Sequence, residues 1–250
     1  MAITISISLQ KGGTGKTTTA ETIAAILGSK GKKVLLVDMD AQMNSTFISG
    51  VNVKKSITDL FIGDAGISEV IYKAEHYDLL AADEYLANLE RAAQVESTLL
   101  TDTLAPVQKI YDFILIDTPP ALGNLLKNCL LASDYVLIPT DARPLSIKGL
   151  DALEPTLNAV HDVSWRFKVL GIVLVKYNER TILNRQIREL LEDRAAAMNT
   201  ILFDTKIREG VAVPESQAMQ KSLIDYAPHS NPCIYYIRLT DDILGRIEKR

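Results

Sequence analysis

The sequence predicts an α/β fold in a single domain, with a mostly parallel, twisted sheet covered by helices on both faces. Short apolar runs alternate along the chain with longer stretches of helical periodicity, the pattern of parallel strands joined by right-handed crossovers. These apolar runs are continuous rather than alternating with polar residues, as in strands buried on both faces. A glycine-rich phosphate-binding motif directly follows the first run, so the expected fold is of the P-loop NTPase type.

The expected elements follow one another along the whole chain. The strands are Ile3–Leu9, Val34–Val37, Tyr77–Ala81, Phe113–Ile116, Tyr135–Ile138 and Val169–Val175. The helices are Thr17–Ser29, Asp83–Ala93, Ser97–Lys109, Leu122–Leu131, Ser146–Val160 and Ile182–Ala197. No repeat, low-complexity tract or linker interrupts this alternation, so we expect residues 1–250 to form one domain, without a separate N-terminal DNA-binding domain.

The amino-acid composition argues against several classes of protein. The chain carries 27 Lys and Arg against 31 Asp and Glu, a net charge of −4, so any binding of nucleic acid must come from a local basic patch. Cys129 and Cys233 are far apart, and no CxxC motif occurs, which argues against a structural zinc site or a redox pair. There is no basic leader and no apolar run of about 18 residues. We expect a cytoplasmic protein that does not act on membranes.

The phosphate-binding motif reads KGGTGKT at residues 11–17, between the first strand and the first helix. Its glycines allow successive backbone N–H groups to point inward and, with the helix N-terminus, to form an anion cradle. In that context Lys16 reaches the β- and γ-phosphates, Thr17 ligates Mg²⁺ and Thr18 contacts the α-phosphate. The nucleotide-binding residues expected here are Lys11, Gly12, Gly13, Thr14, Gly15, Lys16, Thr17 and Thr18.

Acidic residues follow two of the other predicted strands. Asp38 and Asp40 end the run KVLLVDMD, and Asp117 ends FILID. The carboxyl ends of parallel strands are where such folds bind ligands. Asp117 fits a Walker B carboxylate for Mg²⁺; Asp40 fits a group that orients the attacking water or accepts its proton, and Asp38 fits either the metal shell or an anchor for its loop. The expected metal set is Thr17, Asp38 and Asp117.

Residues 8–20, 34–46 and 111–121 together resemble the ParA/Soj-like partition ATPases, within the MinD/ParA group that has a deviant Walker A motif. The resemblance extends to Leu80–Glu90 and Ile207–Leu223 and so covers nearly the whole chain. The family's D-x-D-P-Q-G-N motif appears as residues 38–44 with Ala41 and Met43 in place of proline and glycine. These departures put the rate of hydrolysis in question more than nucleotide binding.

The resemblance implies specific roles. Lys11 corresponds to the family's signature lysine, which each subunit of an ATP-dependent homodimer lends to the phosphates of the other, the logic of an arginine finger. It implies Lys11, Lys16 and Asp40 as catalytic residues and ATP with Mg²⁺ as cofactors. It also implies non-specific DNA and a ParB-like centromere-binding protein as partners in plasmid or chromosome segregation, with the ATP-bound form associated with the nucleoid.

Two further groups of candidate binding residues lie outside the phosphate-binding motif and the strand-end acids. The strand-end residues Lys176, Tyr177 and Asn178 lie where the resemblance places the adenine. The basic residues Arg185, Arg188 and Arg208 are candidates for a DNA-binding surface, although the segment around them is also rich in acidic residues and a solvated helix face fits equally well.

Three other functions remain to be weighed. A MinD-like division-site ATPase needs a membrane-binding tail, whereas the C-terminal segment LTDDILGRIEKR carries Asp241 and Asp242 and looks suited to packing on the domain. An iron–sulfur scaffold ATPase needs a CxxC motif, which is absent. A slowly hydrolysing, nucleotide-gated binding module remains open because of Ala41 and Met43.

Overall fold

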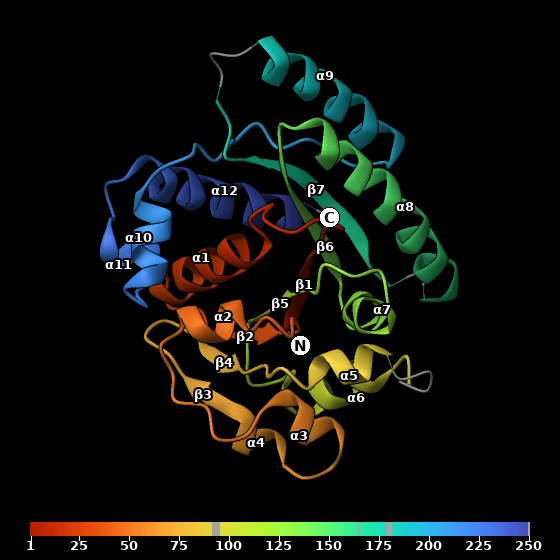
Figure 1. The fold of residues 1–250 in the computed structure, drawn as a ribbon, viewed down its shortest axis with the longest axis vertical. Coiled ribbons are helices and arrows are strands. Elements are labelled where there is room, and N and C mark those ends of the chain that lie inside the picture. The colour runs from red at the N-terminus through yellow and green to blue at the C-terminus, as the bar shows by residue number, and fades with distance from the viewer. Residues whose placement is uncertain (92–95, 165, 179–181, 250) are drawn as a thin grey trace.

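A seven-stranded sheet runs through the centre of the computed structural model, which describes residues 1–91, 96–164, 166–178 and 182–249 (Figure 1). The strand order is β3-β4-β2-β5-β1-β6-β7. Every neighbouring pair is parallel except β3 and β4, which confirms the expected fold class. The strands are β1 (Ile3–Ile7), β2 (Val34–Asp38), β3 (Ile71–Lys73), β4 (Asp78–Leu80), β5 (Phe113–Asp117), β6 (Tyr135–Asp141) and β7 (Lys168–Val175).

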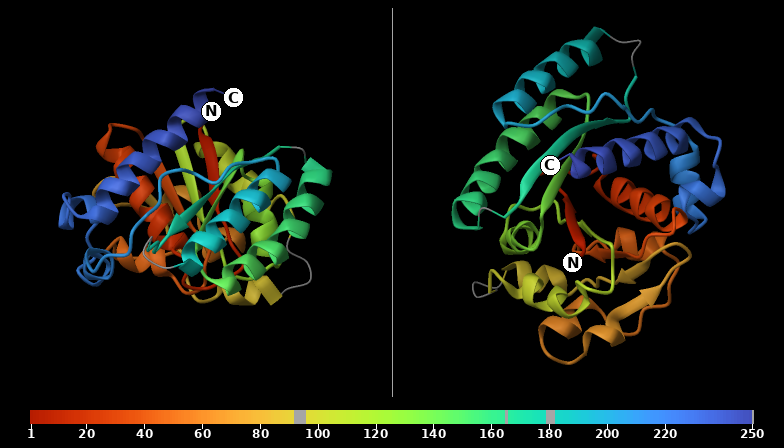
Figure 2. Two further views of the ribbon diagram at one scale, coloured as in Figure 1. Left: turned by 90° about the horizontal axis from the view of Figure 1, so that it is seen from above. Right: turned by 180° about the vertical axis from the view of Figure 1, so that it is seen from behind.

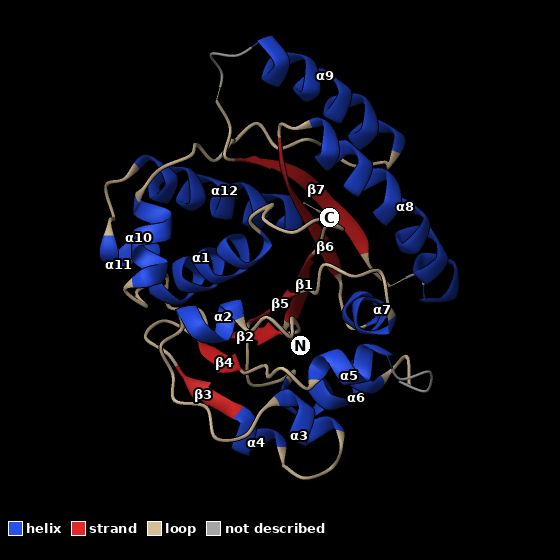
Figure 3. Ribbon diagram, viewed as in Figure 1, coloured by secondary structure: helices blue, strands red, loops and turns tan. Residues whose placement is uncertain are grey.

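Helices cover both faces of this sheet (Figures 2 and 3). The helices are α1 (Lys16–Ser29), α2 (Asn44–Ile48), α3 (Ile57–Phe61), α4 (Ile67–Val70), α5 (Leu86–Arg91), α6 (Leu99–Leu104), the 3₁₀ turn η1 (Ala105–Val107), α7 (Asn124–Leu131), α8 (Pro144–Ser164), α9 (Ile182–Ala197), α10 (Ala212–Ala218), α11 (Leu223–Tyr226) and α12 (Asn231–Glu248). One face packs against α1 and α12, and the other against α5 to α9.

The continuous apolar runs explain this three-layer arrangement. In β2, Leu36 packs into the core beneath α1 and α12, whereas Leu35 and Val37 pack into the core on the opposite face. All three side chains are fully buried. A strand that alternates between two apolar environments needs an apolar residue at every position, and that need explains why the strands could be found from the sequence.

All six predicted strands are present, with ends within a few residues of those expected. The antiparallel edge strand β3 was not expected, because it is only three residues long and half-exposed. The predicted helix Ser97–Lys109 divides into α6 and η1, with a proline at the start of the 3₁₀ turn. The predicted helix Asp83–Ala93 begins later, at Leu86, and its last two residues lie outside the described residues.

The C-terminal segment forms α12, which packs on the domain as its apolar face predicts. Leu239 and Ile243 are buried against the core that includes α1. The Ser230 hydroxyl caps the helix start by accepting the N–H of Cys233 at 3.4 Å. Among the residues that the structure describes, none of the helices has the length and apolarity needed to cross a bilayer.

Gly28 lies on α1 close to the loop that contains His76. A Cβ added there would lie 1.8 Å from the carbonyl oxygen of His76. That contact is backbone, which cannot move aside as a flexible side chain can.

Replacing Gly28 with alanine therefore should lower the free energy of unfolding by about 2 kcal/mol or more, although alanine favours a helix over glycine by roughly 1 kcal/mol. Denaturant unfolding measures the difference. Gly245→Ala is the matched control, since Gly245 lies inside α12 and an added Cβ meets nothing within 4 Å; it should gain about 0.5–1 kcal/mol. Parental stability in Gly28→Ala contradicts the close contact.

Glu21 is an acid on the buried side of α1. Its side chain has 4% exposure, and its hydrogen bonds from Thr22 and Tyr77 are long, at 3.4 and 3.5 Å. Burial raises the pKa of Glu21 to about 8. The folded chain thus keeps a proton that the unfolded chain releases near pH 4.5, so stability must fall as pH rises between these two values.

Glu21→Gln should remove that loss, because the amide is neutral at every pH. We expect the variant to be more stable than the parent by about 3–4 kcal/mol at pH 7 to 8, with the two proteins converging near pH 4.5. Urea unfolding of both proteins at several pH values from 5 to 8 measures the slopes. An identical slope in the two proteins contradicts a neutral Glu21 in the folded state.

Candidate functional site

Two cavities meet at the carboxyl edge of the sheet, beside the loop that joins β1 to α1. We call the first the phosphate cavity; it has a volume of about 410 Å³, and its lining includes Gly12, Gly13, Gly15, Lys16, Thr17, Thr18, Asp40 and Lys176. We call the second the apolar pocket; it has a volume of about 350 Å³, and its lining includes Gly15, Thr18, Val175, Lys176, Ile207, Arg208, Val213, Gln217 and Tyr236. They share Gly15, Thr18, Lys176 and Gln217.

The glycine loop has the backbone that an anion cradle requires. Gly13 and Gly15 have φ values of 75° and 78°, the left-handed region that side chains with a Cβ rarely adopt. Helix α1 begins at Lys16 without a side-chain cap. Its first N–H groups therefore remain available to a ligand at the positive end of the helix.

Lys16 lies in this loop as a buried cation. Its side chain has 7% exposure, and its Nζ donates to the carbonyl oxygen of Lys11 at 3.2 Å. Burial lowers the pKa of Lys16, and the nearby carboxylates of Asp117 and Asp40 oppose that effect. A buried ammonium without a direct carboxylate partner is suited to binding phosphate.

Asp38 and Asp117 lie opposite each other at the ends of the paired strands β2 and β5. The Asp38 Oδ2 accepts the N–H and the hydroxyl of Thr46, both at 2.8 Å, and its Oδ1 accepts the N–H of Asp40 at 3.1 Å. Burial, with a further contribution from Asp117, raises the pKa of Asp38 to about 7. Asp38 thus holds the start of the loop that carries Asp40 through three hydrogen bonds.

The two carboxylate oxygens of Asp117 differ in their contacts. Its Oδ2 accepts the Ser45 hydroxyl at 2.8 Å, while its Oδ1 is buried without a hydrogen-bond partner among the described residues. Burial raises the pKa of Asp117 to about 6, against the lowering effect of the Thr17 and Ser45 hydroxyls and of Lys16. An orphaned carboxylate oxygen beside a threonine hydroxyl is the donor set that Mg²⁺ prefers, so these residues fit that ion.

Asp40 lies at the wall of the phosphate cavity. Its Oδ1 accepts the N–H of Gln42 at 3.0 Å, which fixes the start of the following turn. Met43, at the position where the family motif has glycine, adopts a left-handed φ of 56° and precedes α2. This conformation costs a residue with a side chain roughly 1 kcal/mol, so the loop carries strain that a glycine would avoid.

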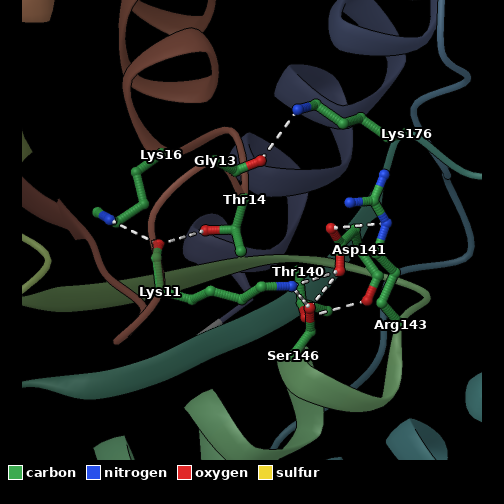
Figure 4. Close-up of polar contacts among 9 residues, drawn as sticks. All are labelled: Lys11, Gly13, Thr14, Lys16, Thr140, Asp141, Arg143, Ser146 and Lys176. Carbon is green, nitrogen blue, oxygen red and sulfur yellow. Dashed lines mark hydrogen bonds and ion pairs between the residues drawn. The ribbon is translucent and has the colours of Figure 1, made fainter.

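Lys11 is held by residues that sequence reasoning did not identify. Its Nζ donates to Asp141 at 3.2 Å and to the Ser146 hydroxyl at 2.7 Å (Figure 4). Asp141 lies at the end of β6 and also contacts Arg143, with 3.5 Å between Nε and Oδ2. The Lys11 side chain has 21% exposure. Within one subunit, this ammonium is thus paired with a carboxylate rather than aimed at the phosphate cavity.

Lys176 joins the two cavities. It has a left-handed φ of 52°, and its Nζ donates to the Gly13 carbonyl oxygen at 2.9 Å (Figure 4). Tyr177 is buried and bonds through its N–H to the Ile207 carbonyl oxygen, and Asn178 is exposed. Of the three predicted adenine-side residues, therefore, only Lys176 lines either cavity.

The apolar pocket owes most of its lining to a distant segment. Residues 207–217, part of the segment Ile207–Leu223 to which the family resemblance extends, supply one wall. Gln217 donates from α10 to the Thr18 hydroxyl at 2.9 Å, and Gln220 donates to the carbonyl oxygen of Phe47 in α2 at 2.9 Å. The end of α10 thereby connects the glycine loop to the loop that carries Asp40.

The three candidate DNA-binding arginines do not share one element. Arg185 is exposed on α9, and Arg188 on the same helix forms an ion pair with Glu192 at 2.8 Å. Arg208 lies instead beside α12, with its guanidinium 5.6 Å from the ring centroid of Tyr235. Its neighbour there is Arg238, which has the same 5.6 Å distance to that ring and which the sequence did not single out.

Comparison with known proteins identifies relatives over the full chain. A family model described as an AAA domain (AAA_31) matches residues 2–169. The chromosome-partitioning ATPase Soj of Thermus thermophilus is 32% identical over 246 residues, which cover 98% of this chain and 96% of that protein.

Solved structures agree on the fold. Cobyrinic acid a,c-diamide synthase from Mycobacterium smegmatis, with a bound ATP analogue and magnesium, has a TM-score of 0.86 and 26% identity, covering 99% of this chain and 96% of the other. The septum site-determining protein MinD from Pyrococcus horikoshii, complexed with Mg-ADP, has a TM-score of 0.80 and 26% identity, covering 97% and 96%.

Proposed function

The chain belongs to the AAA_31 family of AAA domains and to the ParA/Soj-like P-loop ATPases, and on this premise we propose that it is an ATP hydrolase that acts as an ATP-dependent homodimer in the segregation of DNA. The observation that carries the proposal is the convergence at one sheet edge of an anion cradle, a buried lysine and a carboxylate with a spare oxygen. Residues 1–250 form the single ATPase domain of this proposal.

ATP fits the two cavities in one orientation. Its phosphates occupy the phosphate cavity, where the amides of Gly12–Thr18 and the ammonium of Lys16 bind them. Its base occupies the apolar pocket, where Val175 and Ile207 supply apolar contacts. Lys176, at the junction, lies on the phosphate side of the base. The magnesium- and nucleotide-bound relatives support this arrangement.

Thr17 and Asp117 are the residues that would hold Mg²⁺, and Asp38 keeps its place as the anchor of the loop. When bound, the ion supplies positive charge that offsets the charge of the β- and γ-phosphates. Asp40 orients the attacking water and accepts its proton, because its carboxylate lies at the cavity wall beside Lys16. Lys16 stays with the phosphates as negative charge moves toward the leaving group.

Lys11 acts across the dimer in this proposal. Facing a second subunit over two ATP molecules, its ammonium leaves Asp141 and Ser146 for the partner's phosphates. Arg143, already 3.5 Å from Asp141, remains to balance the carboxylate that Lys11 vacates. The exchange makes dimerisation depend on ATP, because without a phosphate across the interface each Lys11 keeps its pair with Asp141.

The cellular role follows from the relatives rather than from the site. The name of the Thermus protein, a chromosome-partitioning ATPase, supports a role in which ATP-bound dimers bind DNA of any sequence and a ParB-like protein stimulates hydrolysis. A MinD-like role is less well supported, since α12 packs its apolar face on the domain. Slow hydrolysis remains a second candidate, because the strained Met43 lies in the loop that must position Asp40.

The first test of this function is the binding of ATP and Mg²⁺ through Lys16. Lys16→Ala should weaken ATP binding on the order of 100-fold or more, because the triphosphate loses the buried ammonium beside the glycine loop. Titration calorimetry measures the affinity, and thermal unfolding checks that the variant is folded. Lys32→Ala, an exposed lysine just after α1, is the matched control. Unchanged affinity in Lys16→Ala sinks the assignment.

The second test concerns Lys11 and uses mixed dimers. Lys11→Ala should bind ATP nearly as the parent does but remain a monomer with little activity, since Lys16 and the loop amides still hold the phosphates. An excess of Asp40→Ala, which is unable to hydrolyse ATP but keeps Lys11, should restore turnover at the Lys11→Ala active site. ATP hydrolysis by the mixture is measured against each variant alone.

A lysine that acted within its own subunit would not be rescued in this way. If light scattering shows mixed dimers while the mixture stays as inactive as its components, the trans role of Lys11 is wrong. Nucleotide binding by the loop would still stand, because the Lys16 experiment tests it separately.

A further inference from the structure

Lys176 is a cation at the place where the phosphate cavity meets the apolar pocket. It lines both cavities, as do Gly15, Thr18 and Gln217. Lys176 directly follows β7, and its side chain extends across to the glycine loop, where Nζ donates to the Gly13 carbonyl oxygen at 2.9 Å (Figure 4). The two residues are 163 positions apart in the chain, so it is the fold that brings them together.

The backbone of Lys176 is fixed in a conformation that a lysine does not favour. Its φ of 52° lies in the left-handed region, which is unfavourable for a residue with a Cβ. Two hydrogen bonds to Ile207 flank it. The Ile207 N–H donates to the Leu174 carbonyl oxygen at 2.8 Å, and the Tyr177 N–H donates to the Ile207 carbonyl oxygen at 3.0 Å. Residues held in this way cluster at ligand-binding sites, and this one carries the side chain that reaches the glycine loop.

The Lys176 ammonium is held in place but not neutralised. One of its three N–H donors is used by the neutral carbonyl oxygen of Gly13, and among the described residues it forms no ion pair. Within the described lining of the phosphate cavity, Lys16 and Lys176 are the cations and Asp40 is the acid. An exposed ammonium whose partner is a neutral carbonyl gains a stronger, charge-assisted hydrogen bond from an anion.

A hydroxyl donor lies at the same junction. The Gln217 Nε2 donates to the Thr18 hydroxyl oxygen at 2.9 Å, and this hydroxyl donates to no group among the described residues. Because the Gln217 amide occupies a lone pair of the oxygen, the hydroxyl proton remains available to a ligand. The junction therefore offers an anion a hydroxyl from α1 as well as an ammonium from the end of β7.

From these contacts we propose that Lys176 binds the α-phosphate of the nucleotide, within the subunit that carries it. This assignment rests on the proposed function, in which the base occupies the apolar pocket and Lys16 binds the phosphates. In that orientation the α-phosphate is the charged group between the two cavities, since it joins the ribose to the other phosphates. Lys176 and Thr18 line both cavities and so are placed beside it. Lys176 is thereby assigned to a phosphate rather than to the adenine.

The α-phosphate is common to ATP and ADP. The contact with Lys176 is therefore made before and after hydrolysis, and it contributes to nucleotide affinity rather than to the chemical step. This distinguishes Lys176 from Lys11, whose proposed contact is with the partner's phosphates and requires ATP. ADP thus tests Lys176 within a single subunit.

The experiment measures ADP binding in the presence of Mg²⁺ by titration calorimetry. Lys176→Gln should weaken the affinity about ten-fold, since the amide keeps a donor for Gly13 but lacks the charge. Lys176→Arg, which keeps the charge, should retain most of the affinity. Lys168→Gln is the matched control and should bind ADP as the parent does, because Lys168 is exposed at the opposite end of β7. Thermal unfolding without nucleotide checks that each variant is folded.

Phosphorus NMR of bound ADP identifies the phosphate that is contacted. In Lys176→Gln the α-phosphorus resonance should move from its position in the parent, while the β-phosphorus resonance stays in place. A shift of the β-phosphorus resonance alone, or equal shifts of both, contradicts the assignment, because Lys176 would then act on the β-phosphate or through the glycine loop as a whole.

Comparison with the parent separates this assignment from the proposed function. If the parent binds ADP and Lys176→Gln binds it equally well, Lys176 is not a phosphate contact, although the nucleotide site stands. If Lys176→Arg loses as much affinity as Lys176→Gln, the charge is not what matters and the assignment is wrong. If the parent itself binds no ADP, both the nucleotide site and the role of Lys176 are overturned.

Discussion

The parallel, in-register pairing of β1, β2 and β5 is the constraint on which the site depends. Asp117 of β5 is paired with Asp38 of β2 on one side and with Ile7 of β1 on the other. The carboxyl ends of the three strands therefore lie in one line. The glycine loop leaves β1 from that line, and the loop that carries Asp40 leaves β2 from it. Because each strand is buried on both faces, a slip of one residue in any of them would move every side chain of that strand to the opposite core and would displace the residues at its carboxyl end from this line.

The same burial sets the electrostatics. Removing Asp38 and Asp117 from water raises the pKa of each carboxyl group, and the nearby charge of Asp117 raises the pKa of Asp38 further. Two hydroxyls of α2 compensate for the lost water: Thr46 donates to Asp38, and Ser45 donates to Asp117. These two adjacent residues thus connect the segment that follows the loop with Asp40 to both strand ends. Among the described residues, the Oδ1 of Asp117 has no hydrogen-bond partner, and a cation beside it would offset the charge of the buried carboxylate.

The sequence could predict those parts of the site whose residues are close together both in the sequence and in space. The glycine loop and the strand-end acids each belong to one strand and the loop that directly follows it, so their structural context could be predicted from the local sequence. Asp141 and Ser146 contact Lys11 from 130 and 135 residues away, and no local pattern marks them. The strand that carries Asp141 was also expected to end at Ile138, before a proline.

Pairing explains why that strand continues. β6 pairs with β1 only as far as Leu137, and beyond it only with β7. Pro139 therefore lies where one edge of the strand is unpaired, the position at which a sheet tolerates a residue without an N–H. Arg238 was missed for a related reason: the Tyr235 ring that it contacts on α12 also contacts Arg208, which comes from a segment distant in sequence. Met43 is the opposite case. The sequence motif identified it as a departure from glycine, but only its left-handed φ value shows that the substitution strains the loop.

The two environments of Lys11 explain how one residue can make assembly conditional on the nucleotide. In a single subunit its ammonium pairs with Asp141, whose side chain is 4% exposed, so the ion pair is largely shielded from water. Leaving that site uncovers a buried carboxylate, which is costly unless another cation takes over, and Arg143 is the neighbour placed to do so. The exchange is favourable only if the new partner carries more negative charge than a carboxylate, as a triphosphate does. Under the proposed function, an empty second subunit offers no such anion, so the lysine stays with Asp141 and the face that would join two subunits lacks its central contact.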